Sequence, residues 1–388
     1  MSQDAVRYDA SHIQVLEGWE AVRRRPGMYV GSIGERGLHQ LVFEVSNRAV
    51  NEVLAGRATR VVITLTPDGG VRIAVDGPGV PFEDAPDLGG PGLGAQLTQM
   101  FVGPRTVGRD AALVGSLHVG LFVATALSSR LTAEVRRGGV LKAQQFVRGV
   151  AVAPPAEVGP ADDSGTVITF WPDADIFETT EVSFDTLVER FRELAFLSRS
   201  LDISLSDQRH PAQSRSVQCR FPGGARDFVA FIDQPARTPV DPEVISFEQG
   251  DERMAGTMEV AFRWRATQEE RVRTFANSHP TLAGSTHDLG FRDGVTAAVN
   301  AYAWKQRRLK ASDPDLRADR ISEGLTAIVS VKLDHPEFEG ATRGALGNTA
   351  VRACVEEATR EHLGRWLREH PKLAEVVLDR ILQDVRRD

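Results

Sequence analysis

The chain has 388 residues, of which 41% are hydrophobic and 26% are charged, and its formal net charge is -7. This composition is typical of a globular protein long enough for two domains, and the acidic balance argues against a uniformly basic nucleic-acid-binding surface. Because the chain has neither an apolar run of about 18 residues nor a signal-peptide pattern, we expect a cytoplasmic protein without membrane contact. Cys219 and Cys354 are too few for a disulfide framework, so we expect two reduced thiols.

The N-terminal region is predicted to be a polar arm followed by a short helix. Residues 1–17 are mostly polar but include Tyr8, and the stretch from Gly18 to Arg25 is predicted to form the helix. Pro26 and Gly27 follow and end it.

The next predicted element is a helix from Leu38 to Glu52. Hydrophobic residues recur there at helical spacing, namely Leu38, Leu41, Val42, Val45, Ala49 and Val53. The same spacing brings four polar residues near one another on another face, namely Glu44, Arg48, Asn51 and Glu52. The sequence therefore predicts a helix that buries one stripe in a core and presents polar side chains to a pocket.

A β-hairpin and a glycine turn follow this helix. Residues 61–66 show the alternation of a strand, Asp68-Gly69-Gly70 is typical of a hairpin turn, and residues 71–75 form the returning strand. The second strand continues into the glycine turn DGPGVP at residues 76–81.

Further along, VGPRT at 102–106 and VGSLHVG at 114–120 precede an apolar run that predicts a buried helix from Val119 to Leu127. A glycine turn that opens a helix directs backbone N–H groups toward anions. The segments that come next predict strands within 131–147, a strand at 165–172, and a helix followed by a strand within 182–207.

The composition becomes polar and rich in Pro and Gly between Pro211 and Gly224, where we place a domain boundary. Beyond it we predict a strand at 258–265 and a helix from Arg292 to about Leu309. Two amphipathic helices, about 349–369 and 372–386, are predicted near the end, with a buried stripe made by Val351, Val355, Leu363, Trp366 and Leu367.

In order and phase, these motifs resemble the ATPase and transducer region of the DNA gyrase B and topoisomerase IV family of type IIA topoisomerases. The likeness covers about residues 8–386, and residues 320–351 are its strongest fingerprint in the second half. It implies an α+β fold with a GHKL-type ATPase domain at residues 1–218 and a ribosomal-S5-like transducer domain at residues 225–388. In that family the N-terminal arm reaches across to the second protomer of a dimer. No acidic metal cluster of the TOPRIM type follows, so we expect DNA cleavage to require another protein chain.

The resemblance also assigns positions in a nucleotide site. Glu44 stands at the general base, whereas Arg48 stands where the family has an asparagine that ligates the magnesium ion of ATP. The other positions implied to contact the nucleotide are Asn51, Asp76, Gly77, Gly79, Gly115, Leu117, His118, Gly120, Thr166 and Arg343. We assign no metal ligand, because an arginine offers only hydrogen-bond donors and a fixed positive charge.

Five departures from the family pattern all fall on this site. Val75 replaces the aspartate that binds the adenine amino group, and Asp76 comes one residue late, on the opposite face of the strand. The others are Arg48, Ser116 with an adjacent one-residue deletion, Ala111 and Ala112 in place of Tyr and Lys, and Ala341 in place of the glutamine in a Gln-Thr-Lys loop whose lysine is now Arg343. We therefore expect ATP binding to be weak and efficient turnover to be absent, and we leave magnesium binding open.

Arg48 has two interpretations. In one, its guanidinium replaces the metal and pairs directly with phosphate. In the other, it pairs with Glu44 or Glu52 on its own helix and plugs an empty pocket, a pairing that would also disable the base. We favour the plug.

Three functions compete. The first, which we favour, is a catalytically silent, dimerising module that acts on gyrase or DNA topology by binding, as a homodimer or a mixed dimer with a genuine gyrase B. The second is an ATP-hydrolysing component of a type IIA topoisomerase that works with a separate cleavage component. The third is a binder of another ligand in the remodelled pocket, against which Val75 argues. DNA contact is a further expectation, set against the simpler interpretation of solvated surface charge, and it rests on Arg273, Arg307, Arg308, Arg317 and Arg320.

Overall fold

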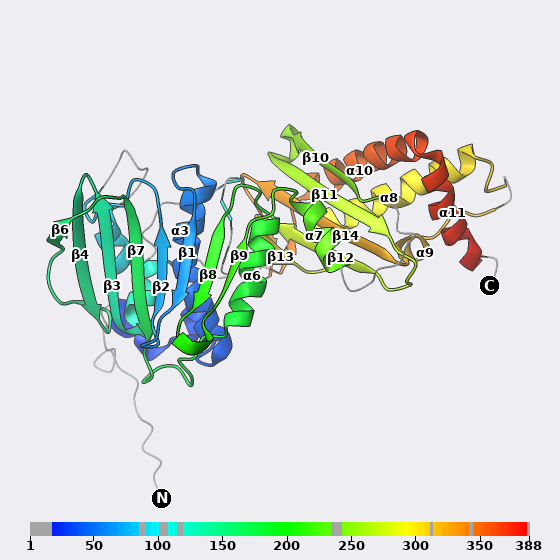
Figure 1. Cartoon of the computed structure of the whole chain (residues 1–388). Coiled ribbons are helices and arrows are strands. Elements are labelled where there is room, and N and C mark those ends of the chain that lie inside the picture. Colours follow the sequence, from blue (N-terminus) through cyan, green and yellow to red (C-terminus); the bar gives the residue numbers. More distant parts are fainter. Residues whose placement is uncertain are drawn as a thin grey trace, which may run out of the picture.

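The computed structural model shows two α+β domains arranged side by side (Figure 1). The structure describes residues 18–84, 91–100, 108–109, 111–112, 114, 119–233, 243–310, 313–340 and 344–385. In the described part of the chain, no helix is long and apolar enough to cross a membrane.

The first domain is built on a nine-stranded sheet with the order β5-β4-β3-β7-β2-β1-β8-β9, in which β6 pairs with β4. Strand β1 runs parallel to β8, and every other pair in this sheet is antiparallel. The strands are β1 (Val61–Leu65), β2 (Val71–Val75), β3 (Ser128–Arg137), β4 (Val140–Val147), β5 (Val150–Ala151), β6 (Ala156–Pro160), β7 (Gly165–Pro172), β8 (Ile203–Asp207) and β9 (Arg215–Cys219). The predicted hairpin of β1 and β2 is confirmed, with Ile63 opposite Ile73.

The helices of the first domain are α1 (Gly18–Arg24), α2 (Gly27–Val30), α3 (Glu35–Leu54), α4 (Leu93–Thr98), α5 (Leu121–Leu127) and α6 (Phe184–Phe196). Helix α3 buries the predicted apolar stripe, since Leu38, Leu41 and Val45 are at most 1% exposed. Helix α6 packs beside α3, where the rings of Phe43 and Phe191 meet edge to face at 5.9 Å. Together these helices place the polar face of α3 within the domain.

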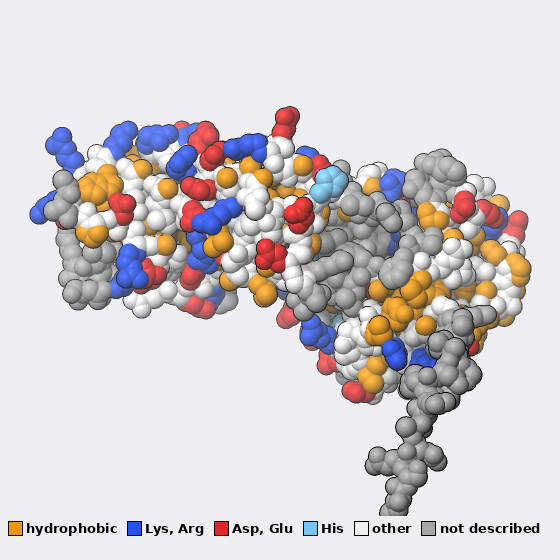
Figure 2. All heavy atoms as spheres, turned by 180° about the vertical axis from the view of Figure 1, so that it is seen from behind, with side chains coloured by type: hydrophobic (Ala, Val, Ile, Leu, Met, Phe, Trp, Pro, Cys, Tyr) orange, Lys and Arg blue, Asp and Glu red, His pale blue; other side chains and the backbone are white. Residues whose placement is uncertain are grey.

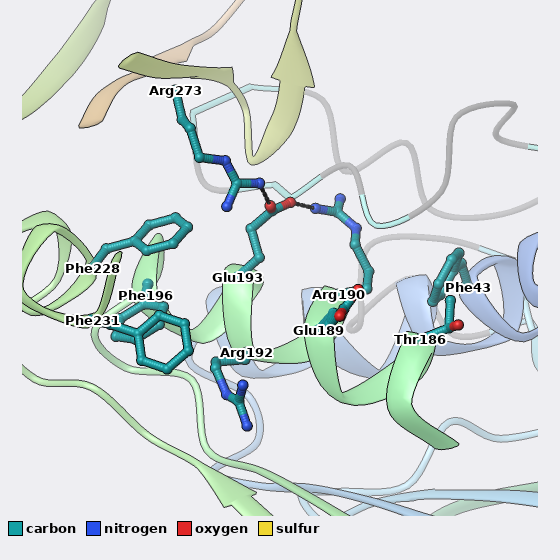
Figure 3. Close-up of a pocket in the computed structure, with 10 residues that line it drawn as sticks. All are labelled: Phe43, Thr186, Glu189, Arg190, Arg192, Glu193, Phe196, Phe228, Phe231 and Arg273. Carbon is teal, nitrogen blue, oxygen red and sulfur yellow. Dashed lines mark hydrogen bonds and ion pairs between the residues drawn. The ribbon is translucent and has the colours of Figure 1, made fainter. Parts of the chain in front are cut away.

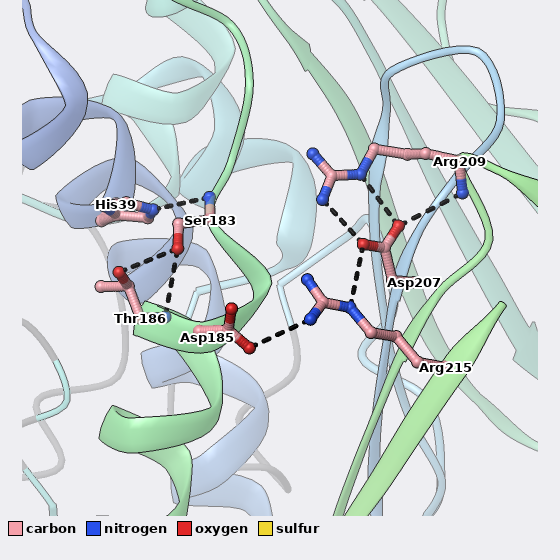
Figure 4. A network of polar contacts seen from close by, with 7 residues as sticks. All are labelled: His39, Ser183, Asp185, Thr186, Asp207, Arg209 and Arg215. Atoms are coloured by element: carbon pink, nitrogen blue, oxygen red, sulfur yellow. Dashed lines mark hydrogen bonds and ion pairs between the residues drawn. The ribbon is translucent and has the colours of Figure 1, made fainter. Parts of the chain in front are cut away.

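The start of α6 is held by hydrogen bonds that also connect it to α3 (Figure 4). The Ser183 hydroxyl accepts from the backbone N–H of Thr186 at 3.3 Å and so caps the helix. The backbone N–H of Ser183 donates to Nε2 of His39 at 2.9 Å, and burial lowers the pKa of His39, which keeps this nitrogen an acceptor. Figure 4 also shows Asp207, at the end of β8, held by the guanidinium of Arg209.

The second domain contains a five-stranded sheet with the order β10-β11-β14-β12-β13 and a small β15–β16 pair. Its strands are β10 (Ile245–Asp251), β11 (Gly256–Trp264), β12 (Arg271–Ala276), β13 (His279–Thr281), β14 (Leu325–Leu333), β15 (Phe338–Glu339) and β16 (Ala345–Leu346). Its helices are α7 (Ala225–Ile232), α8 (Thr286–Lys305), α9 (Ala318–Ser322), α10 (Thr349–Glu369) and α11 (Pro371–Val385). Short 3-10 turns are η3 (Pro211–Gln213) and η4 (Glu252–Met254).

Helix α8 begins six residues before the predicted start at Arg292. The polar residues of its first turn disguised the start, because tertiary contacts satisfy them. Asp288 is 2% exposed, accepts from the backbone N–H of Gly284 at 2.8 Å and pairs with Arg292. Of the predicted stripe on α10, Val351 and Leu367 are buried, as are Val355 and Leu363, and Trp366 is only partly buried.

An apolar cluster joins the two domains. Phe196, at the end of α6, stacks on Phe221 and Phe228 with ring centroids 3.8 and 4.6 Å apart. Three residues of the second sheet belong to the same cluster, namely Ala261, Phe275 and Ile328. Strand β9 of the first sheet ends at Cys219, and α7, which packs on the second sheet, begins at Ala225. The chain therefore passes from one core to the other within these few residues.

Candidate functional site

Glu44 lies in the middle of α3 and is 3% exposed. Its carboxylate accepts a hydrogen bond from Nε2 of Gln40 at 2.8 Å, one helical turn earlier. It also accepts from the backbone N–H groups of Val119 and Gly120, at 3.1 and 3.4 Å, where the chain enters α5. The predicted base position is therefore occupied by a buried carboxylate that binds the backbone of the second glycine turn.

Arg48 lies one turn after Glu44 and pairs with Glu52 on the same helix. Its Nη1 lies 2.8 Å from Oε1 of Glu52, and the two side chains are 16% and 6% exposed. Burial lowers the pKa of Arg48, the charge of Glu52 opposes this effect, and the nearby Arg57 adds to it. Among the described residues, the buried Nε and Nη1 of Arg48 have no acceptor in hydrogen-bond alignment.

Glu52 also accepts two hydrogen bonds from Arg57, which follows α3. Nε of Arg57 lies 2.8 Å from one carboxylate oxygen and Nη2 lies 3.0 Å from the other. This forked geometry raises the pKa of Arg57. One buried acid thus serves two arginines, and the sequence pattern did not indicate the role of Arg57.

Asn51 is 3% exposed and holds the backbone at Ala112. Its Oδ1 accepts from the N–H of Ala112 at 2.9 Å, and its Nδ2 donates to the carbonyl of the same residue at 3.3 Å. One turn earlier, Oδ1 of Asn47 accepts from the N–H of Val114 at 3.3 Å. Sequence reasoning missed Asn47, although its spacing of four residues from Asn51 places both amides on one face of α3.

The glycine turn after β2 brings Val75 and Asp76 to opposite sides. Val75 is 7% exposed in the sheet. The Asp76 carboxylate accepts from the backbone N–H groups of Thr59 and Arg60, at 2.7 and 3.0 Å, and from the Thr59 hydroxyl. Burial alone would raise the pKa of Asp76, but these hydrogen bonds outweigh it and lower the pKa. Asp76 thus fixes the entry to β1.

Two glycines make this turn because a side chain has no room there. Gly77 has φ of 100°, and a Cβ on it would lie 2.4 Å from the carbonyl oxygen of Arg57. Gly79 has φ of 71°, and its Cβ would lie 2.6 Å from the carbonyl oxygen of Arg136. The hydroxyl of Thr166 on β7 accepts from the N–H of Val80 at 2.9 Å and ties the turn to the sheet.

The described residues bring together one part of the predicted site. Glu44 and Gly120 are in contact, and Arg48 follows Glu44 on the same helix. Four predicted contacts of the nucleotide lie outside the described residues, namely Gly115, Leu117, His118 and Arg343, as do Ser116 and Ala341. Ala111 and Ala112 are buried. Within the described part of the chain, no group of three or more His, Cys, Asp or Glu side chains is placed to hold a metal ion.

Comparison with known proteins decides the family. The 43K ATPase domain of Thermus thermophilus gyrase B, solved in complex with an aminocoumarin, matches with a TM-score of 0.78 and 31% identity, over 95% of this chain and 95% of that chain. The chain belongs to the DNA gyrase B family. The family profile described as DNA gyrase B matches residues 224–388. The topoisomerase IV ATP-binding domain of Francisella tularensis, in complex with a small-molecule inhibitor, matches with a TM-score of 0.74 and 27% identity, over 96% of this chain and 99% of that one.

Full-length relatives in the gyrase B family agree. DNA gyrase B of Streptomyces coelicolor is 42% identical over 97% of this chain, and that of Mycolicibacterium smegmatis is 38% identical over 98%. The chain spans 57% and 60% of the lengths of these two relatives. The predicted α+β fold, a GHKL ATPase-type domain followed by a transducer domain, is confirmed by the match to gyrase B structures.

Proposed function

We propose that the chain is a catalytically silent member of the gyrase B family that dimerises and acts on gyrase or on DNA topology by binding. The observation that carries this proposal is the pairing of Arg48 with Glu52 inside α3. By the resemblance, Arg48 occupies the position of an asparagine that ligates magnesium. The pairing supports the plug interpretation of Arg48 over the direct phosphate contact.

The donor set at this position does not fit a magnesium-bound triphosphate. Magnesium takes oxygen ligands, and a guanidinium supplies none and repels the ion. The only carboxylate that Arg48 is seen to pair with, Glu52, is already shared with Arg57 among the described residues. We therefore derive no chemical step through a metal–nucleotide complex.

The adenine end supports the same proposal. Val75 offers no acceptor to an amino group, and the carboxylate of Asp76 is engaged by Thr59 and Arg60. Leaving a buried amino group without its acceptor costs roughly 1 to 3 kcal/mol. That is about a 5- to 150-fold loss of affinity.

A working ATPase is the second candidate, and one observation favours it. Glu44 remains buried at the base position, beside the backbone N–H groups of Val119 and Gly120. In a nucleotide-bound state those donors would be free to hold an anion, and Glu44 would be free to orient water. In the silent state that we propose, the carboxylate itself occupies them.

Titration calorimetry with a non-hydrolysable ATP analogue, with and without magnesium, tests the proposal. We expect no measurable binding, or weak binding that magnesium does not strengthen. Phosphate release is measured in parallel for the wild type and for Glu44→Ala. Magnesium-dependent release that disappears in Glu44→Ala would establish the ATPase and overturn the silent module.

The partner is proposed to be a second copy of the chain or the gyrase B of the host. Native mass spectrometry of the purified chain, alone and mixed with that gyrase B, distinguishes a homodimer from a mixed dimer. We expect one of these two species at micromolar concentration. A monomer under both conditions would contradict the dimerising role. Tyr8 and the rest of the N-terminal arm lie outside the described residues.

DNA contact remains a proposal with modest support. Four of the five arginines considered for it pair with acids: Arg273 with Glu193, Arg308 with Asp379, Arg317 with Asp319 and Arg320 with Glu323. On the face shown in Figure 2, acidic side chains lie among the basic ones over the second domain. If DNA binds, its affinity should fall steeply with salt, and a flat response in a filter-binding assay would remove the idea.

A further inference from the structure

A buried arginine joins the two domains beside a cavity of about 360 Å³ (Figure 3). Arg190 of α6 is 12% exposed. Its Nε and Nη2 donate to the carbonyl oxygen of Val114 at 3.1 and 3.0 Å. Nη2 also donates to the carbonyl oxygen of Ser278, in the β12–β13 turn of the second domain, at 3.1 Å. One guanidinium therefore binds two segments that are 164 residues apart in the sequence, since 278 minus 114 is 164.

The acid partner of Arg190 extends this connection. Glu193, one turn later on α6 and 10% exposed, accepts from Nη1 of Arg190 with one carboxylate oxygen. Its other oxygen accepts from Arg273 of β12, which reaches down from the second domain in Figure 3. Burial lowers the pKa of Arg190, and the charge of Glu193 opposes that effect. The three side chains form one continuous ionic chain across the domain boundary.

The segment that includes Val114 is bound to the second domain at a second point. Nδ2 of Asn277 donates to the carbonyl oxygen of Gly108 at 3.1 Å. Arg109 donates to both carboxylate oxygens of Asp334, at 3.0 and 2.6 Å, and holds the pKa of Asp334 down at about 2. The described residues of 108–114 thus lie against the second domain at both ends.

The turn that receives these bonds is itself fixed. Asn277 and Ser278 have φ of 47° and 64°, in the left-handed region that residues with a Cβ seldom adopt. The side chain of Asn277 holds the turn by accepting from the N–H of Leu333 at 2.9 Å and donating to its carbonyl at 3.0 Å. Both residues are buried. A strained conformation of this kind persists only where surrounding contacts determine it.

On its other side, the same segment is held by the helix of the candidate site. Asn51 binds Ala112, Asn47 binds Val114, and Glu44 binds Gly120 just beyond. Contacts between described residues therefore lead without a gap from the polar face of α3, through Ala112 and Val114, to Arg190 and the second domain.

We propose that Arg190 fixes the two domains in one relative arrangement through protein contacts alone, so that no nucleotide is needed to set the position of the second domain. The proposal rests on the proposed silent function, because it explains how a chain with a degenerate site keeps a defined shape for binding a partner. Arg190 is a positioning residue in this account. Coupling of this kind must be measured, since spatial connection alone does not establish it.

The distance between spin labels on the two domains tests the proposal in the full-length chain. Labels are attached to Ser164→Cys in the first domain and Glu369→Cys in the second, both at exposed positions, while Cys219 and Cys354 are buried. We expect a narrow distance distribution in the wild type that does not change with a non-hydrolysable ATP analogue. Arg190→Met should broaden it, because the bonds to Val114 and Ser278 are lost.

The matched control is Arg209→Met, which removes a forked ion pair within the first domain and should leave the distribution narrow. Hydrogen exchange of backbone amides in 108–114 should accelerate by about tenfold or more in Arg190→Met, the change expected for losing one charged hydrogen bond, and not in the control. If Arg190→Met does not fold, Arg273→Met removes the contact from the second domain at a side chain 44% exposed.

A broad distribution in the wild type, or an unchanged one in both arginine variants, would overturn the proposal. Calorimetry on the same samples separates it from the proposed function. A wild type that binds no nucleotide and shows a broad distribution refutes the domain connection and leaves the silent function standing. A wild type that hydrolyses ATP and broadens only on loss of Arg190 refutes the silent function and supports the connection.

Discussion

Two arginines converge on the single buried carboxylate of Glu52, and they hold it differently. Arg57 makes two aligned hydrogen bonds, whereas Arg48 makes one close contact without aligned donors among the described residues. We expect Arg57→Met to lower the free energy of unfolding by about 2 to 3 kcal/mol, because hydrogen bonds to a buried charge are lost. Arg48→Met should lower it by less than about 1 kcal/mol, since it also removes a buried guanidinium.

Urea unfolding at neutral pH measures both effects. The double variant leaves Glu52 without a cation, so its loss should exceed the sum of the two single losses. Equal losses in the two single variants would contradict this account of the pair.

His287 at the start of α8 makes stability depend on pH. It is fully buried, its Nε2 lies 3.1 Å from the Thr281 hydroxyl, and burial lowers its pKa to about 4. The unfolded chain takes up this proton near pH 6.5 and the folded chain only near pH 4, so stability should fall as the pH drops through that window. The loss is about 3 kcal/mol at most.

Unfolding free energies measured from pH 7 to pH 4 check this expectation. His287→Asn should flatten the pH dependence, whereas His210→Asn, at an exposed histidine, should keep it. A profile that is equally steep in wild type and His287→Asn would assign the effect to other groups.

At the scale of elements, α8 and α10 approach closely through glycine. A Cβ on Gly290 would lie 2.3 Å from the carbonyl oxygen of Arg352, and one on Gly294 would lie 2.6 Å from that of Glu356. Alanine at either glycine should therefore destabilise the protein by about 1 to 3 kcal/mol, despite its better helix propensity. Gly364 of α10 is the control, because its Cβ would meet only the end of Arg368 at 3.6 Å.

Thermal unfolding of the three alanine variants tests this packing. Gly364→Ala should raise stability by up to about 1 kcal/mol, since alanine favours the helix and nothing obstructs it. If Gly290→Ala stabilised the protein as Gly364→Ala does, the close approach of the two helices would be wrong.

At the scale of the molecule, Phe196 connects two hydrophobic cores. Its ring stacks between residues of the first domain and α7, and the same cluster includes Phe275 of the second sheet. We expect the wild type to unfold in one calorimetric transition. Phe196→Ala should cost about 3 to 5 kcal/mol and separate this transition into two, because the shared cluster is lost.

Phe146→Ala provides the comparison. This residue is fully buried in the first core alone, so its loss should be of similar size, yet it should not separate the domains. Two transitions already present in the wild type would show that the cluster does not couple the domains.

Sequence alone determined the local features of this protein. The stripe of α3, the β1–β2 hairpin and the order of the two domains follow from periodicity and turn residues, which are properties of neighbours in the chain. The replacement of a metal-binding amide by Arg48 was visible for the same reason, through resemblance to the gyrase B family. The start of α8 was misplaced, because Asp288 and His287 are polar residues that only distant contacts accommodate.

Tertiary structure decided the partners. Sequence spacing allowed Arg48 to pair with Glu44 or Glu52, and the fold pairs it with Glu52, which also binds Arg57. Nothing local indicated that Asn51 holds Ala112 or that Arg190 spans the two domains. Hydrogen-bond partners far apart in the chain are set by how helices and sheets pack, so periodicity can name the polar residues of a site but not the groups that they bind.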